Sequence, residues 1–180
     1  MKAAASKEFD AKAYARKYFN GKLTPALNNA IDLTQLITLL RQDKEKTFDV
    51  YSHALGIGNI RYFLVKGEGL IESVNENDVT ILLKADTSQK NVQIATEFVF
   101  GNAIRDASGF IDINEFRNTM DFNNVSAELN KIVRSEVLPS FKATAKKGQT
   151  VQFSGAIECN RAHLNLQQIE VVPVSLKITE

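Results

Sequence analysis

The order of strand-like and helix-like segments along the chain is the feature that most constrains its fold. β-Branched and aromatic residues dominate several short runs, and turn-rich stretches such as NEN and DTSQK separate them. One long run has apolar residues at helical spacing instead. In chain order, the segments are strands 60–74, 78–85 and 91–105, a helix over 121–138, and strands 149–158 and 167–178.

This order is that of an OB-type barrel. We therefore predict an α+β fold in which an OB-like, five-stranded antiparallel β-barrel has a helix between strands three and four. Gly67 and Gly69 inside the first strand predict a bulge or a sharp bend of the kind that closes a barrel. The apolar face of helix 121–138, which Pro139 is expected to end, requires burial, so we expect this helix to plug one end or side of the barrel.

A short helical layer precedes the strands. Residues 9 to about 53 have the pattern of amphipathic helices, with helix starts predicted at Asp10 and Asp32. Gly56 and Gly58 then mark the change to strand-forming residues. We predict an N-terminal helical extension over 1–55 and an OB-like barrel domain over 56–180, packed as one unit.

The composition argues against several classes of protein. With 22 Lys and Arg against 21 Asp and Glu, the net charge is +1, whereas nucleic-acid-binding proteins usually have a clear basic excess. The one cysteine, Cys159, allows neither an internal disulfide nor a CxxC zinc pair. No apolar run is long enough to cross a bilayer, and residues 1–7 lack the apolar centre of a signal peptide.

Residues 106–116, DASGFIDINEF, match the second half of an EF-hand calcium loop. With Gly109 at the sixth position of the loop and Glu115 at the twelfth, the first position falls on Ile104. An EF-hand needs a carboxylate ligand there, which an alkyl side chain does not replace. A strand end followed by a turn is the favoured interpretation, and we predict no metal site.

The sequence has no recognisable catalytic set. His53, His163 and Cys159 supply its imidazole and thiol groups, and none has a partner at the spacing of a triad or a metal site. Neither GxGxxG nor GxxxxGK occurs, so no phosphate-binding loop and no cofactor are expected. The sequence leaves open whether the protein is an enzyme and favours a non-enzymatic role.

A binding pocket combines apolar walls with a few polar groups. Arg105 and Asp106 form a charge pair at the end of an apolar strand. On or beside the other strands, the most similar combination of aromatic and charged residues is that of Tyr62, Lys66 and Phe116. We hypothesise that Arg105 and Asp106 face one cleft with Tyr62 or Lys66. The competing interpretation is that the two residues merely pair with each other at a strand end.

Several segments together resemble the predicted bacterial periplasmic lipoproteins built on a domain of unknown function. The resemblance covers nearly the whole chain, and its most specific block is IRDASGFIDINEF at 104–116, with FLVKGEG at 63–69 as a further part. It implies a periplasmic protein anchored by a lipid on an N-terminal cysteine, which is absent from this chain, and a link to sugar-uptake systems. The family has no established activity, so the resemblance assigns no functional residues.

Three functions follow as hypotheses. The first is a non-enzymatic periplasmic accessory protein that binds a small molecule or a transporter component, with the lipid anchor as its only attachment to the membrane. The second is a hydrolase-type enzyme that uses Asp106, Asp112 or the Cys159 and His163 pair in an unfamiliar arrangement. The third is an oligonucleotide-binding module, which the near-neutral charge argues against, so we expect no nucleic-acid partner.

Overall fold

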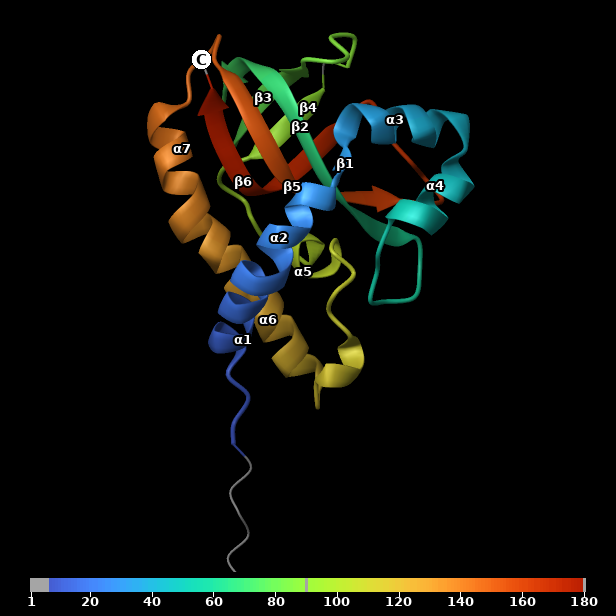
Figure 1. The fold of residues 1–180 in the computed structure, drawn as a ribbon, viewed down its shortest axis with the longest axis vertical. Coiled ribbons are helices and arrows are strands. Elements are labelled where there is room, and N and C mark those ends of the chain that lie inside the picture. The colour runs from blue at the N-terminus through green and yellow to red at the C-terminus, as the bar shows by residue number, and fades with distance from the viewer. Residues whose placement is uncertain (1–6, 90, 180) are drawn as a thin grey trace, which may run out of the picture.

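The computed structural model describes residues 7–89 and 91–179 and has an α+β fold (Figure 1). Its strands are β1 (Ile31–Asp32), β2 (Ile60–Val74), β3 (Asp78–Leu83), β4 (Val92–Ala95), β5 (Thr150–Asn160) and β6 (Ile169–Thr179). Its α-helices are α1 (Ala11–Tyr18), α2 (Thr24–Ala26), α3 (Leu33–Gln42), α4 (Lys44–Tyr51), α5 (Ala103–Asp106), α6 (Thr119–Ile132) and α7 (Leu138–Thr144). Two π-helical turns, Phe19–Leu23 and Val133–Val137, and two 3-10 turns, Leu27–Asn29 and Ile113–Glu115, complete the elements.

The strands pair in a closed ring because β2 has two long neighbours. Its residues 60–70 pair with β5, and its residues 69–74 pair with β3. From β3 the ring continues through β4 and β6 back to β5. The short β1 joins from outside the ring, parallel to β2 at Val65 and Lys66.

The predicted α+β class is confirmed, and so is a helical segment between the third and fourth strands of the ring. The prediction of five antiparallel strands was wrong in detail. The sheet has six strands, and the pairs β1–β2 and β4–β6 are parallel. A parallel pair needs a long crossover connection, and the helices and β5 between β4 and β6 supply it.

Alternate residues of the strands point into two separate cores. On β2, Phe63 and Val65 belong to one core, whereas Tyr62 and Leu64 contact the other. All strands of the ring contribute to the first core, which therefore lies inside the ring. The second core receives buried residues from β2, β5 and β6 and from α1, α5 and α6, so it lies between the outer face of the sheet and these helices.

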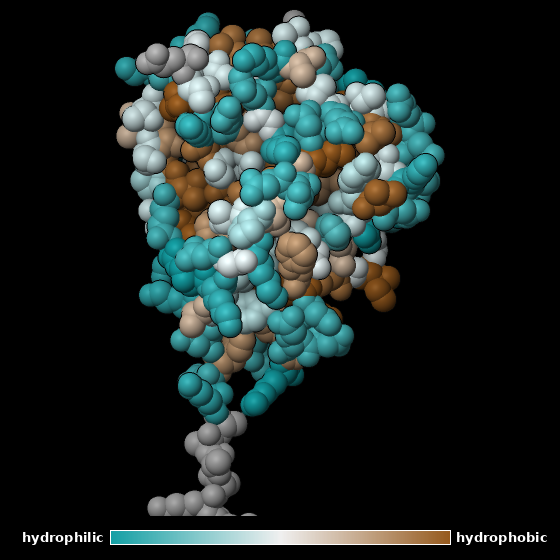
Figure 2. All heavy atoms as spheres, viewed as in Figure 1, coloured by the Kyte–Doolittle hydropathy of each residue, from teal (hydrophilic) through white to brown (hydrophobic). Residues whose placement is uncertain are grey.

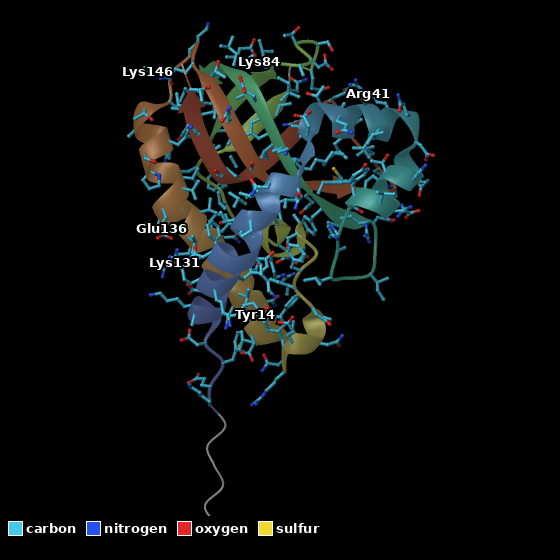
Figure 3. All side chains as sticks on the ribbon, viewed as in Figure 1. Tyr14, Arg41, Lys84, Lys131, Glu136 and Lys146 are labelled. Carbon is cyan, nitrogen blue, oxygen red and sulfur yellow. The ribbon has the colours of Figure 1, made fainter. Side chains whose placement is uncertain are left out.

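The inner core is closed by helices other than the predicted one. α3 and α4 contribute Leu33, Leu36 and Phe48 to it, and α7 contributes Phe141. Helix α6 instead lies below the sheet in the view of Figure 1, where it packs against α1 and α5. An ion pair of 2.6 Å between Arg16 and Glu136, the second of which Figure 3 labels, also joins α1 to the π-helical turn after α6.

The observed starts of two helices agree with the sequence prediction, and the observed end of one helix does not. Asp10 and Asp32 cap α1 and α3 as predicted, since their side chains accept backbone N–H groups at 2.9 Å. Pro139 was expected to end the long helix, which in fact continues to Thr144. The π-helical turn Val133–Val137 places this proline in the first turn of α7, where its missing N–H is tolerated.

The strand predicted over 91–105 ends at Ala95, and its last residues form helix α5. Gly101, at φ +81°, turns the chain before this helix. Ala103, Ile104 and Ala107 are then buried together, at the spacing of one helical face. Arg105 and Asp106 are therefore helical residues, and the prediction that they end a strand was wrong.

The glycines of β2 give room for close packing. A β-carbon on Gly67 would lie 2.6 Å from the ring of Phe153, and one on Gly69 would lie 2.8 Å from the carbonyl oxygen of Leu82. At Gly69 the strand changes partner from β5 to β3. The register shift occurs between Ile71 and Ser73, so the predicted bulge lies just beyond the glycines.

Candidate functional site

Arg105 and Asp106 form an ion pair inside the protein. Nε of Arg105 donates to Oδ1 of Asp106 at 2.6 Å, and Nη2 donates to Oδ2 at 3.3 Å. Both side chains are 4% exposed. Because the pair is bidentate and desolvated, each charge is compensated within the pair, and removing either partner would leave a buried charge.

Phe122 of α6 holds the guanidinium group of Arg105 from a second direction. The Cζ atom of Arg105 lies 3.6 Å from the centre of the Phe122 ring, a cation–π geometry. Nη1 also donates to the backbone oxygen of Phe122 at 3.4 Å. These hydrogen bonds leave N–H groups on both Nη atoms available to a ligand.

The pair lines a cleft of about 290 Å³, which we name the Arg105 cleft. One wall is residues 54–60, which comprise most of the loop between α4 and β2 and the first residue of β2, and the rest comes from Tyr62, from residues in or next to α5, from Ile113 and from α6. The walls are mostly apolar, and the polar groups are Asn59, Tyr62, Asn102, Arg105 and Asp106. Such a combination is typical of small binding pockets.

Tyr62 reaches this cleft from β2 and is almost fully buried. Burial, and then the nearby anions Glu158 and Asp106, raise the pKa of its hydroxyl to about 12. The phenol is therefore protonated at every physiological pH. In this state the hydroxyl can donate a hydrogen bond, for which the Glu158 carboxylate is one acceptor, and it cannot act as a base.

The structure brings together three of the five residues that the sequence singled out. Arg105, Asp106 and Tyr62 line the same cleft. Lys66 lies further along β2, where its ammonium group donates to the backbone oxygen of Asn28 at 3.0 Å. Phe116 belongs to an aromatic cluster, with ring centres 5.5 Å from Phe9, 5.2 Å from Tyr14 and 5.4 Å from Phe122.

Tyr14, labelled in Figure 3, is the polar member of this cluster on α1. Its hydroxyl donates to Glu115 at 2.8 Å. Burial and the Glu115 carboxylate raise the pKa of Tyr14 well above its usual value. Phe116 is outside the described lining of the Arg105 cleft and contacts the ring of Phe122, which lines it.

Sequence reasoning missed the other half of the cleft wall. Residues 54–60 are separated from Asn102, Ile113 and Phe122 by about 40 residues of chain or more. The GIG stretch was a signal for the loop, but it gave no indication of what the loop covers.

A second cleft of about 180 Å³, which we name the Phe110 cleft, lies beside the first. Its walls include His53, Leu64, Ser108 and Phe110. The hydroxyl groups of Ser108 and Tyr18 are hydrogen-bonded to each other below its floor. Burial, and then the charge of Arg61, lower the pKa of His53, which favours the neutral imidazole.

The thiol and imidazole suggested for a hydrolase are not arranged for catalysis. Burial, and then the charge of Glu158, raise the pKa of Cys159 to about 12, so its thiol is a poor source of thiolate. His163 is exposed and lies in a turn, where its backbone N–H donates to the side-chain oxygen of Asn160 at 3.0 Å.

In the described part of the chain, no three His, Cys, Asp or Glu side chains form a group that could hold a metal ion. Within the same residues, no helix has both the length and the apolar character needed to span a membrane.

The fold places the chain among OB-fold proteins. A solved structure of an OB-fold protein from Thermotoga maritima MSB8 superposes with a TM-score of 0.83, at 28% sequence identity. The match covers 96% of this chain and all of that one. No curated protein matches the chain.

The chain belongs to the predicted periplasmic lipoprotein family DUF2291, which matches residues 1–177. The family predicted from the sequence is thereby confirmed. Its description also agrees with the predicted localisation, a lipid-anchored protein of the periplasm.

Proposed function

We propose that this protein is a non-catalytic binding module of the periplasm, and that its ligand occupies the Arg105 cleft. The observation that carries the proposal is the buried Arg105–Asp106 pair, which lines a mostly apolar cleft. Since the two charges compensate each other, the cleft favours a ligand without net charge that offers hydrogen-bonding groups. In the same proposal, the closed ring of strands is an OB-type barrel that serves as the scaffold.

The hydrolase hypothesis has less support. Its candidates were Asp106, Asp112, or the Cys159 and His163 pair. The thiol has a raised pKa, and the Asp106 carboxylate is engaged by Arg105. A catalytic acid or nucleophile needs a free and suitably titrating group.

A thermal-shift screen tests the proposal. Neutral sugars, nucleotides, divalent metals and uncharged peptides serve as probes, and the sugars also test the link to sugar uptake that the family resemblance suggests. A ligand at about a hundred times its Kd stabilises the folded state by roughly 2.7 kcal/mol, which raises the Tm of a domain this size by roughly 5–10 °C. We expect such a shift from at least one uncharged class.

A filled cleft provides the site control. Ile113 is exposed at the mouth of the cleft, so Ile113→Trp should occlude it without disturbing the core. Met120→Trp adds the same ring at an exposed position outside the lining. The Tm shift should vanish in the first variant and persist in the second. Failure of every probe, or equal shifts in both variants, would contradict the proposal.

A further inference from the structure

The exposed large apolar side chains are concentrated beside the two clefts. Of the eleven such residues in the described part of the chain, six line a cleft: Ile57, Ile60 and Ile113 the Arg105 cleft, and Val50, Tyr51 and Phe110 the Phe110 cleft. Figure 2 shows hydrophobic atoms projecting where the loop between α4 and β2 lies. Patches of this kind on a protein surface are typical of interaction sites.

The two clefts are separated by the backbone at residues 53–54 and 106–107, which we name the ridge. Residues adjacent in sequence line different clefts: His53 and Ala107 line the Phe110 cleft, whereas Ala54 and Asp106 line the Arg105 cleft. Backbone hydrogen bonds between His53 and Tyr62, at 2.8 and 2.9 Å, join the ridge to β2. A ligand that fills both clefts must therefore cross this ridge.

The charge of this face is unusually low. Charged residues make up 24% of the chain. The described lining of the Phe110 cleft contains no Asp, Glu, Lys or Arg, and that of the Arg105 cleft contains one Arg and one Asp, which pair with each other. In contrast, Lys7, Glu8 and Asp121 are among several charged residues that line a hollow near the N-terminal end of α1. Depletion of charge with enrichment of large apolar residues is typical of the core of a protein interface.

We infer that this face binds a segment of another protein, which inserts one uncharged apolar side chain into each cleft. The inference rests on the proposed binding function and names the class of its partner. A small molecule is normally enclosed by one cavity, whereas here two neighbouring clefts are each lined by three exposed large apolar side chains. Anchor side chains in neighbouring pockets are a common way for proteins to recognise each other.

The low charge decides between classes of partner. An anionic lipid surface or a nucleic acid would require unpaired Lys and Arg side chains, which neither lining supplies. An uncharged polypeptide segment requires none. The free N–H groups of Arg105 can also donate to backbone carbonyl groups of such a segment.

Fluorescence titration with synthetic peptides tests this inference. The chain contains no tryptophan, so indole emission reports on the peptide alone. Capped, uncharged peptides carry one tryptophan and one leucine at varied separations, and control peptides replace the leucine by serine or by glutamate. We expect the best two-anchor peptide to bind at least about tenfold more tightly than its serine and glutamate controls.

Substitutions of exposed lining residues test whether each cleft takes part in binding the peptide. Ile113→Ser alters the Arg105 cleft and Phe110→Ser the Phe110 cleft, and both side chains are exposed, so the fold should be retained. Each variant should lower the affinity for the two-anchor peptide to that of the serine control. Met120→Ser, at an exposed position in neither lining, should leave the affinity unchanged.

Other outcomes would overturn the inference. They are equal binding of one-anchor and two-anchor peptides, binding insensitive to Ile113→Ser and Phe110→Ser, or no binding at all. Sedimentation that shows a dimer lost in Ile113→Ser would assign the face to a second copy, and flotation with phosphatidylglycerol vesicles would assign it to a lipid surface. If a small molecule stabilises the protein through the Arg105 cleft while every peptide fails, the proposed function stands and this inference falls.

Discussion

The ring of His53 packs directly on the backbone of Gly109. A β-carbon at residue 109 would lie 2.7 Å from Cε1 of the imidazole and closer still to Nδ1. Gly109 also has a φ of +75°, a left-handed conformation that residues with a β-carbon rarely adopt. The contact joins the segment before β2 to the segment after α5, and so it holds the ridge between the two clefts.

We predict that Gly109→Ala destabilises the protein more than Gly148→Ala does. Gly148 has a φ of +92°, but a β-carbon there would have no atom within 4 Å, so its substitution adds only backbone strain, about 1–3 kcal/mol. Gly109→Ala adds the clash with His53 to a similar strain. In a His53→Ala background this excess should disappear, which urea denaturation of the four variants would measure. An excess that persists without the imidazole would contradict the contact.

The stability of the protein should fall in mild acid through His53. Burial, and then Arg61, lower the folded-state pKa of this imidazole below its ordinary value of 6.5. The unfolded chain therefore takes up a proton near pH 6.5, while the folded protein resists it until a lower pH. The stabilisation is complete above pH 6.5 and is lost as the pH falls toward the folded-state pKa.

Urea denaturation between pH 8 and pH 5 measures this loss. The free energy of unfolding should decline less steeply with acidification in His53→Gln than in the native protein. His163→Gln, which removes an exposed imidazole, serves as the comparison. Identical slopes for the native protein and His53→Gln would show that this residue does not contribute.

The long strands β2, β5 and β6 were the most predictable part of the fold, because each shows an apolar pattern that does not depend on its neighbours. The predicted and observed bounds of β2 agree, 60–74. The segment after β4 was misassigned because EFVFG also looks like a strand, and only burial against the outer core selects the helix at Ala103. The helix end expected at Pro139 was wrong for the same reason. The π-helical turn that lets the helix continue past this proline depends on tertiary packing, which local sequence rules do not include.

The site was partly predictable, and strand geometry explains the limit. Tyr62 and Lys66 lie on the same face of β2, but four residues of strand separate them by about 13 Å, more than one small cleft spans. Tyr62 therefore meets Arg105, whereas Lys66 meets the segment before β1. Residues 54–60 and Phe122 meet at the cleft through long-range packing, which no local pattern encodes.

Cys159 should react slowly in the native protein. Its pKa of about 12 leaves, at pH 8, on the order of a thousandfold less thiolate than an unperturbed cysteine would have. Reaction with a disulfide reagent should therefore be slow in buffer and fast in urea. Glu158→Gln should accelerate the native reaction modestly, because burial and not this carboxylate is the main cause of the shift. Equal rates in buffer and in urea would contradict the raised pKa of the thiol.

The buried ion pair gives the sharpest test of the site. Asp106→Leu leaves the Arg105 guanidinium buried without its partner, and Arg105→Met leaves the carboxylate in the same condition, so each should lower the free energy of unfolding by about 3–5 kcal/mol. The double variant removes both charges and keeps apolar volume, so it should be more stable than either single variant. Urea denaturation of all four proteins gives the coupling between the two residues. Losses that simply add in the double variant would mean that Arg105 and Asp106 do not depend on each other.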